Sequence, residues 1–272
     1  MLPALALMTH SNSTFGLLII GDEILSGKRL DRHFQKVREI FAARELALSQ
    51  VTYLGDDRAR LAAFLRASFA GEDILFSCGG IGATPDDHTR QAAAAALGVP
   101  LIRHPEAEAL IASRMIEVGQ PVTPERLQMG EFPAGATLIP NPVNRIPGFS
   151  IREHHFVPGF PEMAWPMIEW LLDNQYRDRF HRYHQVERSM IVRGLAEATL
   201  TPLMLGIERD YPGVKVFSLP HLNVQHPDDY TIELGVKGPA TAIDIAFVHL
   251  RTGALTLGGN IEQVASAQHG LA

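Results

Sequence analysis

The N-terminal part of the chain alternates short apolar runs with stretches of helical period, and this alternation restricts the fold more than any other feature. The runs Leu17–Ile20 and Asp73–Cys78 are almost wholly apolar, as is typical of strands covered on both faces of a parallel sheet. Leu46–Leu54 is rich in β-forming residues and predicts another strand. Repeated β–α–β units with right-handed crossovers predict an α/β layered domain.

The segments between these runs carry apolar residues at helical spacing, separated by charged ones. The stripes that predict helices are Leu30, Phe34, Val37 and Phe41, then Leu61, Phe64, Leu65 and Phe69. Further helices are expected near Asp87–Leu97, Pro105–Val118 and Glu162–Leu172, and short strands near Thr137–Ile139, Gly148–Ile151 and His155–Val157. We expect Asp56 and Asp57 to supply acidic capping at the start of the second helix.

The length of 272 residues permits one large domain or two smaller ones, at roughly 100–200 residues per domain. The polar segment Asp173–Gln185 predicts a helix tail that leads into a linker. We therefore expect a leader at 1–14, a first domain at 15–180 and a small α+β domain at 186–272. In the second domain, the helical candidates are Ala196–Ile207 and Thr241–Leu250.

Composition excludes several classes of protein. Apolar residues make up 46% of the chain, enough for a sizeable core, and the net charge of −6 argues against a nucleic-acid partner. The single cysteine, Cys78, removes any intrachain disulfide and any cysteine-only zinc site. No apolar run reaches the roughly 18–20 residues of a membrane span, and the leader lacks the positive start of a secretory signal. We expect a cytoplasmic protein without membrane contact.

Two glycine-containing loops, Gly21–Gly27 and Gly79–Thr89, follow the first and third predicted strands. In an open parallel sheet, ligands bind outside the carboxyl ends of the strands, near the switch in strand order. Glycines let backbone amides crowd around an anion, and a helix N-terminus adds its positive dipole end. The pattern predicts a phosphate or pyrophosphate site, and its candidate residues are Gly21, Glu23, Gly79, Gly80, Gly82, Thr84 and Thr89.

Carboxylates accompany these loops, and the turn after the second strand adds two more. They are Asp22, Glu23, Asp86, Asp87, Asp56 and Asp57. Carboxylates beside a phosphate site suit a divalent cation such as Mg²⁺ or Mn²⁺, and one could act as a general base on water. The alternative is that Asp86 and Asp87 only cap the next helix.

Other polar and apolar signals are weaker. Consecutive His154 and His155 on a strand should point to opposite faces, so they should not share a metal. His181 and His184 lack a carboxylate partner at metalloprotease spacing and are read as a solvated face, and Cys78 is read as a packed thiol. Trp165 and Trp170, with Met163 and Met167, predict helix core or an oligomer contact. Asn141 and Asn144 could line the pocket or form a plain proline turn.

The two loops, together with Pro158–Met163, carry a family resemblance. Their GDE, GGIG and Asp86-Asp87 elements resemble the signatures of the molybdopterin-binding (MoaB/MogA-like) fold, and the full set resembles the CinA (competence/damage-inducible protein A) family. This implies a three-layer, mostly parallel sheet followed by a small KH-like domain. The loop reads GIGAT where GLGPT is commoner in the family. No counterpart of the family's C-terminal deamidase domain is expected, so deamidation is not carried over.

The resemblance also implies a function. Similar proteins bind molybdopterin, adenylylate it, or hydrolyse ADP-ribose- or FAD-like dinucleotides with a divalent metal. We predict a metal-dependent pyrophosphatase (Mg, Mn or Co) acting on a nucleotide, with a non-catalytic molybdopterin- or nucleotide-binding protein and a pterin adenylyltransferase as alternatives. The candidate residues are Asp87, Asp56 and Asp22 for catalysis, Asp86 and Asp87 for metal, and Asn141, Pro158 and Gly159 beside the glycine loops for binding. Relatives of this fold are commonly oligomeric, so we expect a homo-oligomer.

Overall fold

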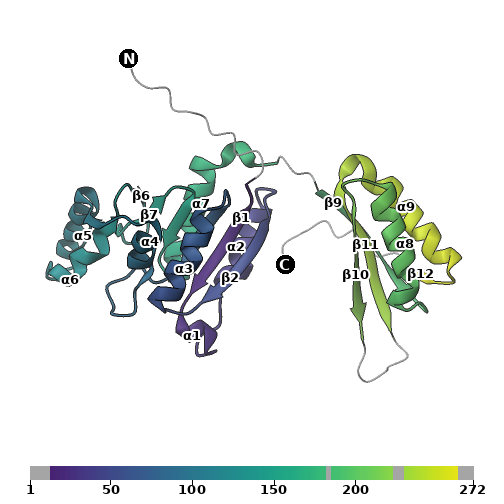
Figure 1. The fold of residues 1–272 in the computed structure, drawn as a ribbon, viewed down its shortest axis with the longest axis horizontal. Coiled ribbons are helices and arrows are strands. Elements are labelled where there is room, and N and C mark those ends of the chain that lie inside the picture. Colours follow the sequence, from purple (N-terminus) through teal and green to yellow (C-terminus); the bar gives the residue numbers. More distant parts are fainter. Residues whose placement is uncertain (1–12, 182–184, 223–229, 263–272) are drawn as a thin grey trace, which may run out of the picture. The chain divides into compact units, whose positions relative to one another are not determined.

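The protein is described by a computed structural model covering residues 13–181, 185–222 and 230–262. The chain divides into two units, Met1–Phe180 and His181–Ala272 (Figure 1). Most of the predicted leader and His184 lie outside the described residues. No helix in the described ranges has both the length and the apolarity needed to cross a bilayer.

The first unit is built on a six-stranded sheet with the order β2-β1-β3-β8-β7-β6. Its strands are β1 (Phe15–Ile20), β2 (Leu48–Leu54), β3 (Ile74–Cys78), β6 (Thr137–Ile139), β7 (Gly148–Ile151) and β8 (His154–Val157). The first four in the order pair in parallel, whereas β7 pairs antiparallel with both β8 and β6. The predicted α/β fold with a mostly parallel sheet is confirmed.

Helices cover both faces of this sheet. On one face lie α2 (His33–Ala42) and α7 (Pro161–Gln175), and on the other lie α3 (Arg58–Phe69) and α4 (Thr89–Leu97). The unit also contains α1 (Asp22–Leu25), α5 (Pro105–Glu117), α6 (Pro124–Leu127) and the 3-10 turns η1 (Gln128–Gly130) and η2 (Arg177–Arg179). A small separate sheet pairs β4 (Leu101–Arg103) with β5 (Glu131–Pro133). Sequence patterns did not predict α1, α6 or this small sheet, because none contains a run long enough to show a period.

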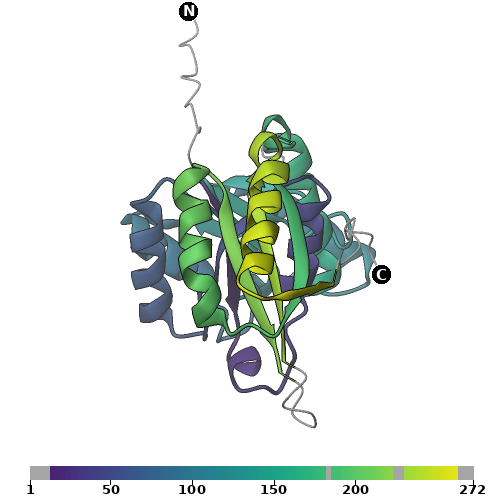
Figure 2. The same ribbon diagram turned by 90° about the vertical axis from the view of Figure 1, so that its right-hand side faces the viewer.

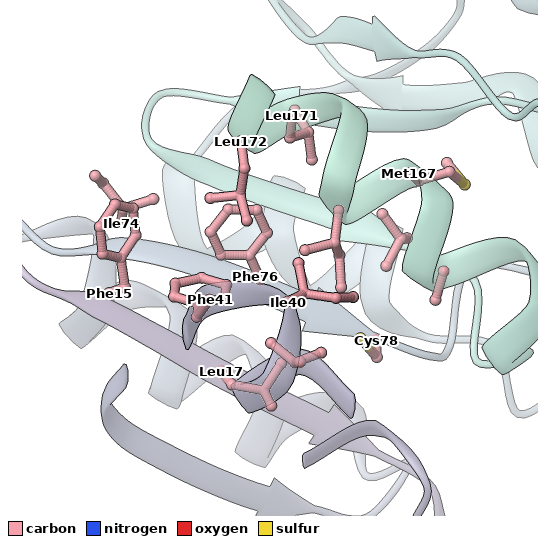
Figure 3. Packing of buried hydrophobic residues seen from close by; sticks show 14 of the residues in the cluster. Phe15, Leu17, Ile40, Phe41, Ile74, Phe76, Cys78, Met167, Leu171 and Leu172 are labelled. Atoms are coloured by element: carbon pink, nitrogen blue, oxygen red, sulfur yellow. The ribbon is translucent and has the colours of Figure 1, made fainter. Parts of the chain in front are cut away.

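Successive side chains of β1 and β3 supply the cores on the two faces. On one face, Phe15, Leu17 and Phe76 pack against α2 and α7, including Phe41 and Met167 (Figure 3). On the other face, the alternate residues of these strands pack against α3, α4 and α5. Because both faces are buried, every residue of β1 is buried, as its continuous apolar run predicts.

The strand order places a topological switch between β1 and β3. The chain leaves β1 towards α2 on one face of the sheet and leaves β3 towards α4 on the opposite face. The two loops therefore diverge at the carboxyl ends of adjacent strands, the position at which open α/β sheets bind ligands.

Two predicted helix starts are wrong by a few residues. Leu30 is 84% exposed and precedes α2, because Asp31 accepts hydrogen bonds from the amides of His33 (2.7 Å) and Phe34 (3.1 Å) and so begins the helix at His33. The helix expected from Asp87 begins at Thr89 instead. Asp57 caps α3 as predicted, through the Arg60 amide at 2.8 Å.

The second unit is a small α+β structure. Its antiparallel sheet has the order β10-β11-β9-β12, and Figure 2 shows its two helices on one face of the sheet. The elements are β9 (Gln185–Arg193), α8 (Glu197–Asp210), β10 (Lys215–His221), β11 (Thr231–Pro239), α9 (Ala240–Thr256) and β12 (Asn260–Glu262). Its own core joins the helices to the sheet through residues such as Leu200, Leu234 and Leu250. The predicted small α+β unit is therefore present.

Candidate functional site

Four strand ends assemble the candidate site. The parallel strands β1, β2, β3 and β8 end at the same edge of the sheet, and they are followed by Gly21, Gly55, Gly79 and Pro158. The amide of Gly21 continues the ladder to Leu54 O at 3.0 Å, and that of Gly79 continues it to Val157 O, also at 3.0 Å. The loops that follow leave the sheet from this common edge.

Gly79 lies where the chain segments after β1, β3 and β8 approach one another closely. A Cβ at this position would lie 2.5 Å from Ile20 O, and φ is +112°, a conformation that side-chain-bearing residues rarely adopt. On its other side, a Cβ at Gly159 would lie 3.3 Å from the Gly79 Cα. The ends of β1, β3 and β8 therefore meet at Gly79, and only glycine fits there.

The first turn of α4 holds the carbonyl groups of the glycine loop. The Thr89 hydroxyl donates to Gly79 O at 3.0 Å, and the Thr89 amide donates to Gly80 O at 2.9 Å. Arg90 Nη2 donates to Gly82 O at 2.6 Å. By contrast, the amides of residues 80–83 donate to no acceptor within the described residues. The loop therefore presents four consecutive free backbone donors.

Asp87 shapes the same loop rather than capping α4. Its Oδ2 accepts hydrogen bonds from both the amide (2.8 Å) and the hydroxyl of Thr84. A Cβ at Gly82 would lie 2.5 Å from this oxygen, so glycine is required there by close packing. Asp86 is exposed beside it. Thus the capping alternative does not describe Asp87, whose carboxylate closes the loop at Thr84.

Asp22 and Asp56 are brought together across the ends of β1 and β2. The Asp22 amide donates to Asp56 Oδ2 at 2.8 Å, and the Asp56 amide donates to Asp22 Oδ1 at 3.3 Å. Burial raises the pKa of Asp56, and the neighbouring carboxylates of Asp22, Glu23 and Asp86 raise it further, against the opposing effect of the Asp22 amide. The predicted capping of α3 by Asp56 is therefore wrong, because its carboxylate binds the Asp22 amide instead, beside the other candidate site residues.

The remaining predicted residues lie at or near this edge. Glu23 folds back over Gly21, where a Cβ would lie 2.7 Å from its Oε2, and its carboxylate is 3.7 Å from Arg29 Nη1. Asn141 is 4% exposed, and its Oδ1 accepts from the Val143 amide at 3.0 Å. The Asn141 Nδ2 is buried without a hydrogen-bond partner in the described structure. No hydrogen bond in that structure links Asn141 to the glycine loop.

Sequence patterns missed His33 and Arg90. His33 is 5% exposed, and its Nε2 lies 3.1 Å from Gly159 O, which ties the start of α2 to the loop after β8. Burial is the main cause of a lowered pKa at His33. Arg90 reaches beneath the glycine loop from α4. Neither belongs to a recognisable motif, although each lies in the first turn of a helix that follows a predicted ligand loop.

His154, His155 and Cys78 are buried, and their contacts are structural. His154 Nε2 lies 2.7 Å from the Ser68 hydroxyl on one face, whereas His155 Nε2 lies 2.6 Å from the Tyr176 hydroxyl on the other, so the predicted opposite orientation is confirmed. Burial lowers the pKa of His154 to about 4 and of His155 to about 3. Cys78 is buried at the end of β3 and burial raises its pKa, which agrees with a packed thiol.

Of the tryptophans and methionines of α7, which are predicted to be helix core or an oligomer contact, Met167 and Trp165 belong to the core. Met167 is fully buried, and Trp165 packs against the same cluster beneath the guanidinium of Arg32, 5.4 Å from the ring centroid. Trp170 is 37% exposed. The helix therefore serves the fold, and homo-oligomerisation stays a prediction.

Comparison with known proteins identifies the family. The family described as "Probable molybdopterin binding domain" matches residues 16–178, which include every strand and loop of the candidate site. The chain belongs to this family. The predicted resemblance to the molybdopterin-binding fold is thereby confirmed, whereas a KH-like second unit and the lack of a deamidase domain stay predictions.

Individual relatives agree with this assignment. A CinA-like protein of Geobacter metallireducens is 30% identical over 205 residues, 74% of this chain and 50% of that protein. A protein of Pyrobaculum calidifontis is 28% identical over 208 residues, 75% of this chain and 79% of that protein. The crystal structure of CinA from Thermoplasma acidophilum, whose title gives its function as unknown, has a TM-score of 0.54 at 23% identity and covers 60% of this chain and 98% of that one. The chain is thus similar to CinA-like proteins.

Proposed function

We propose that this member of the molybdopterin-binding family is a divalent-metal-dependent pyrophosphatase acting on dinucleotides of the ADP-ribose or FAD type. The observation that carries the proposal is the meeting of two features at one sheet edge. Free amides of residues 80–83 are suited to a diphosphate, and the carboxylate pair Asp22–Asp56 lies at the adjacent strand ends. Such a pairing suits hydrolysis of a phosphoanhydride assisted by a cation.

The donor set fits a cation only in part. No three His, Cys, Asp or Glu side chains among the described residues converge closely enough to hold a metal ion. Each of Asp22, Asp56 and Asp87 uses one carboxylate oxygen within the loops, and its other oxygen accepts no hydrogen bond there. Mg²⁺ is commonly held by one or two carboxylates with substrate phosphate oxygens and water completing the set. The residues therefore fit a cation that enters with the diphosphate.

In this proposal each group has a defined task. The amides of residues 80–83 would bind the diphosphate oxygens and orient the anhydride for in-line attack. Asp22, Asp86 and Asp87 would provide carboxylate ligands, and a bound cation would neutralise charge on the leaving phosphate. Asp56, whose pKa is raised by burial, would accept a proton from the attacking water. Asn141 could donate its free Nδ2 to the organic part of the ligand.

A metal scan tests the hydrolase. The protein is incubated with ADP-ribose or FAD and Mg²⁺, Mn²⁺, Co²⁺ or Ni²⁺, and AMP is quantified by chromatography. We expect AMP only when protein and cation are both present. If no combination releases AMP above the protein-free control, the pyrophosphatase proposal fails.

The lack of a three-ligand cluster in the described residues favours a second candidate, a non-catalytic molybdopterin- or nucleotide-binding protein. Such a protein would use the same amides and need no cation. Titration calorimetry with molybdopterin, with and without Mg²⁺, distinguishes the two: metal-independent binding without turnover supports the binding protein.

A further inference from the structure

Arg90 lies in the first turn of α4, directly beneath the glycine loop, and only 3% of its surface is exposed. Its Nη2 donates to Gly82 O at 2.6 Å, and its Nη1 donates to Gln128 O. The buried Nε has no hydrogen-bond partner in the described residues. The guanidinium is thus held by backbone carbonyl groups.

This buried cation has no carboxylate at ion-pair distance among the residues that the structure describes. Asp87 and Glu131 attract the guanidinium electrostatically from beyond ion-pair distance, and both also have other partners: Glu131 pairs with Arg103 at 2.9 Å, and Asp87 Oδ2 binds Thr84. Burying a charge without a counter-ion is unfavourable, and natural proteins usually pair such groups. Because the described residues give the guanidinium no direct carboxylate partner, an anion bound close to the glycine loop would stabilise it.

The carbonyl contacts also fix where the loop amides point. All described peptide bonds are trans, so the N–H of each peptide points opposite to its C=O. Thr89 holds the carbonyls of Gly79 and Gly80, and Arg90 holds that of Gly82. The amides of Gly80, Ile81 and Ala83 therefore point away from α4.

We propose that Arg90 is the positioning residue of an anion site at the amides of residues 80–83. Its guanidinium fixes the 82–83 peptide through Gly82 O, and a phosphate or diphosphate bound at these amides balances its charge. This inference rests on the proposed function, since it concerns the same loop. Beyond that function, Arg90 makes binding of the anion depend on a side chain that does not itself contact the anion.

Calorimetric titration with inorganic pyrophosphate and with ADP-ribose tests the proposal, without added metal. The variants are Arg90→Gln, which loses the charge, and Arg90→Lys, which keeps the charge but cannot hold two carbonyls in a planar fork. Arg103→Gln is the matched control, because Arg103 is a nearby arginine with its own carboxylate partner. Circular dichroism and thermal unfolding without ligand establish that each variant is folded.

For wild type we expect saturable binding of both probes. Arg90→Gln should raise both dissociation constants by about tenfold or more, and Arg90→Lys should give a smaller increase, because charge is retained while the peptide is held less well. Arg103→Gln should stay within about twofold of wild type. The salt dependence of binding should weaken in Arg90→Gln but not in Arg90→Lys, a difference that loss of loop structure alone would not produce.

Wild-type affinity in a folded Arg90→Gln protein would overturn the role of Arg90 and leave the proposed function intact. If Arg90→Gln does not fold, wild-type affinity in Arg90→Lys would likewise overturn the role of the fork. If wild type binds neither probe in the absence of metal, this inference fails, whereas the proposed function fails only if AMP release with an added cation is also absent.

Discussion

Asp22 and Asp56 cap each other across the carboxyl ends of β1 and β2: each backbone amide donates to the other's carboxylate, at 2.8 and 3.3 Å. A Cβ on Gly55 would lie 2.2 Å from Asp22 Oδ1, so the glycine before Asp56 is what allows the two turns to approach. The exchange holds two carboxylates side by side at the ends of β1 and β2, and β1 is adjacent to β3, which the glycine loop follows. A cation and an anion could therefore be bound at one place.

The substitution Asp56→Asn tests whether the Asp56 carboxylate takes part in the reaction, and Asp57, which caps α3, offers a comparison at the next position. Asp56→Asn keeps an oxygen that can accept from the Asp22 amide but removes a negative charge and a proton acceptor. We expect a loss of about 100-fold or more in metal-dependent AMP release from ADP-ribose. Asp57→Asn is the matched control, because asparagine still caps α3 at the Arg60 amide. Equal activity in the two variants would show that Asp56 takes no part in the reaction.

The close contact at Gly79 predicts a large stability cost for a single methyl group. Gly79→Ala should lower the free energy of unfolding by about 2–4 kcal/mol, because its Cβ would meet Ile20 O and φ is +112°. Gly98→Ala has φ of +68° with nothing within 4 Å and should cost only about 1 kcal/mol.

Urea unfolding followed by tryptophan fluorescence measures both glycine variants. The two tryptophans, Trp165 and Trp170, lie in α7, so the signal reports on the first unit. Equal costs for Gly79→Ala and Gly98→Ala would show that the loops after β1 and β3 are less closely packed than described.

His155 makes the first unit sensitive to acid. Its pKa is about 3 in the folded protein and 6.5 ordinarily, so between these values the unfolded chain binds the extra proton and stability falls as the pH falls. A change from pH 6.5 to about 5 should cost about 2 kcal/mol from this residue. His155→Gln should remove that part of the pH dependence, leaving the part due to His154.

Urea titrations at several pH values check this, again by tryptophan fluorescence. His221→Gln, an exposed histidine in the second unit, should leave the pH dependence of this transition unchanged. If His155→Gln retains the full wild-type slope, the acid sensitivity arises elsewhere.

Cys78 should be inert in the folded protein. It is 1% exposed and burial raises its pKa, so the reactive thiolate is disfavoured at neutral pH. A thiol reagent such as DTNB should react only after unfolding, and Cys78→Ala should show the same level of the proposed AMP release as wild type. Rapid labelling of the native protein, or loss of turnover in Cys78→Ala, would instead indicate a reactive cysteine at the site.

The strands of the first unit were predictable because their signals are local. The continuous apolar runs of β1 and β3 reflect burial on both faces, and Asp57 has the position of an N-cap. Asp56, its immediate neighbour, is predicted both as a cap of α3 and as a catalytic candidate, but nothing local in the sequence shows that its side chain binds the amide of Asp22, 34 residues earlier. Residue propensity and spacing predict single helices and strands, whereas a pairing such as Asp22–Asp56 depends on which strands lie next to each other in the sheet.

The role of Arg90 could not be predicted from the sequence, because it too depends on a contact between residues far apart in the chain. It follows a recognisable glycine loop, but one of its two carbonyl partners belongs to Gln128, 38 residues later in a segment with no periodic signal. For Leu30 the sequence predicts too much. Leu30 fits the helical stripe but lies outside α2, because Asp31 accepts hydrogen bonds from the first amides of that helix. In both cases a side chain to backbone hydrogen bond decides the outcome.

In the proposed function, the free amides of residues 80–83 bind the ligand's phosphate groups. An amide-resolved NMR titration of the ¹⁵N-labelled protein with inorganic pyrophosphate tests it most directly. We predict saturable shifts that are largest for the amides of Gly80, Ile81, Gly82 and Ala83, with Gly98 and Gly119 unmoved. Saturable binding that leaves these four amides unshifted, or no binding at all, would contradict the claim.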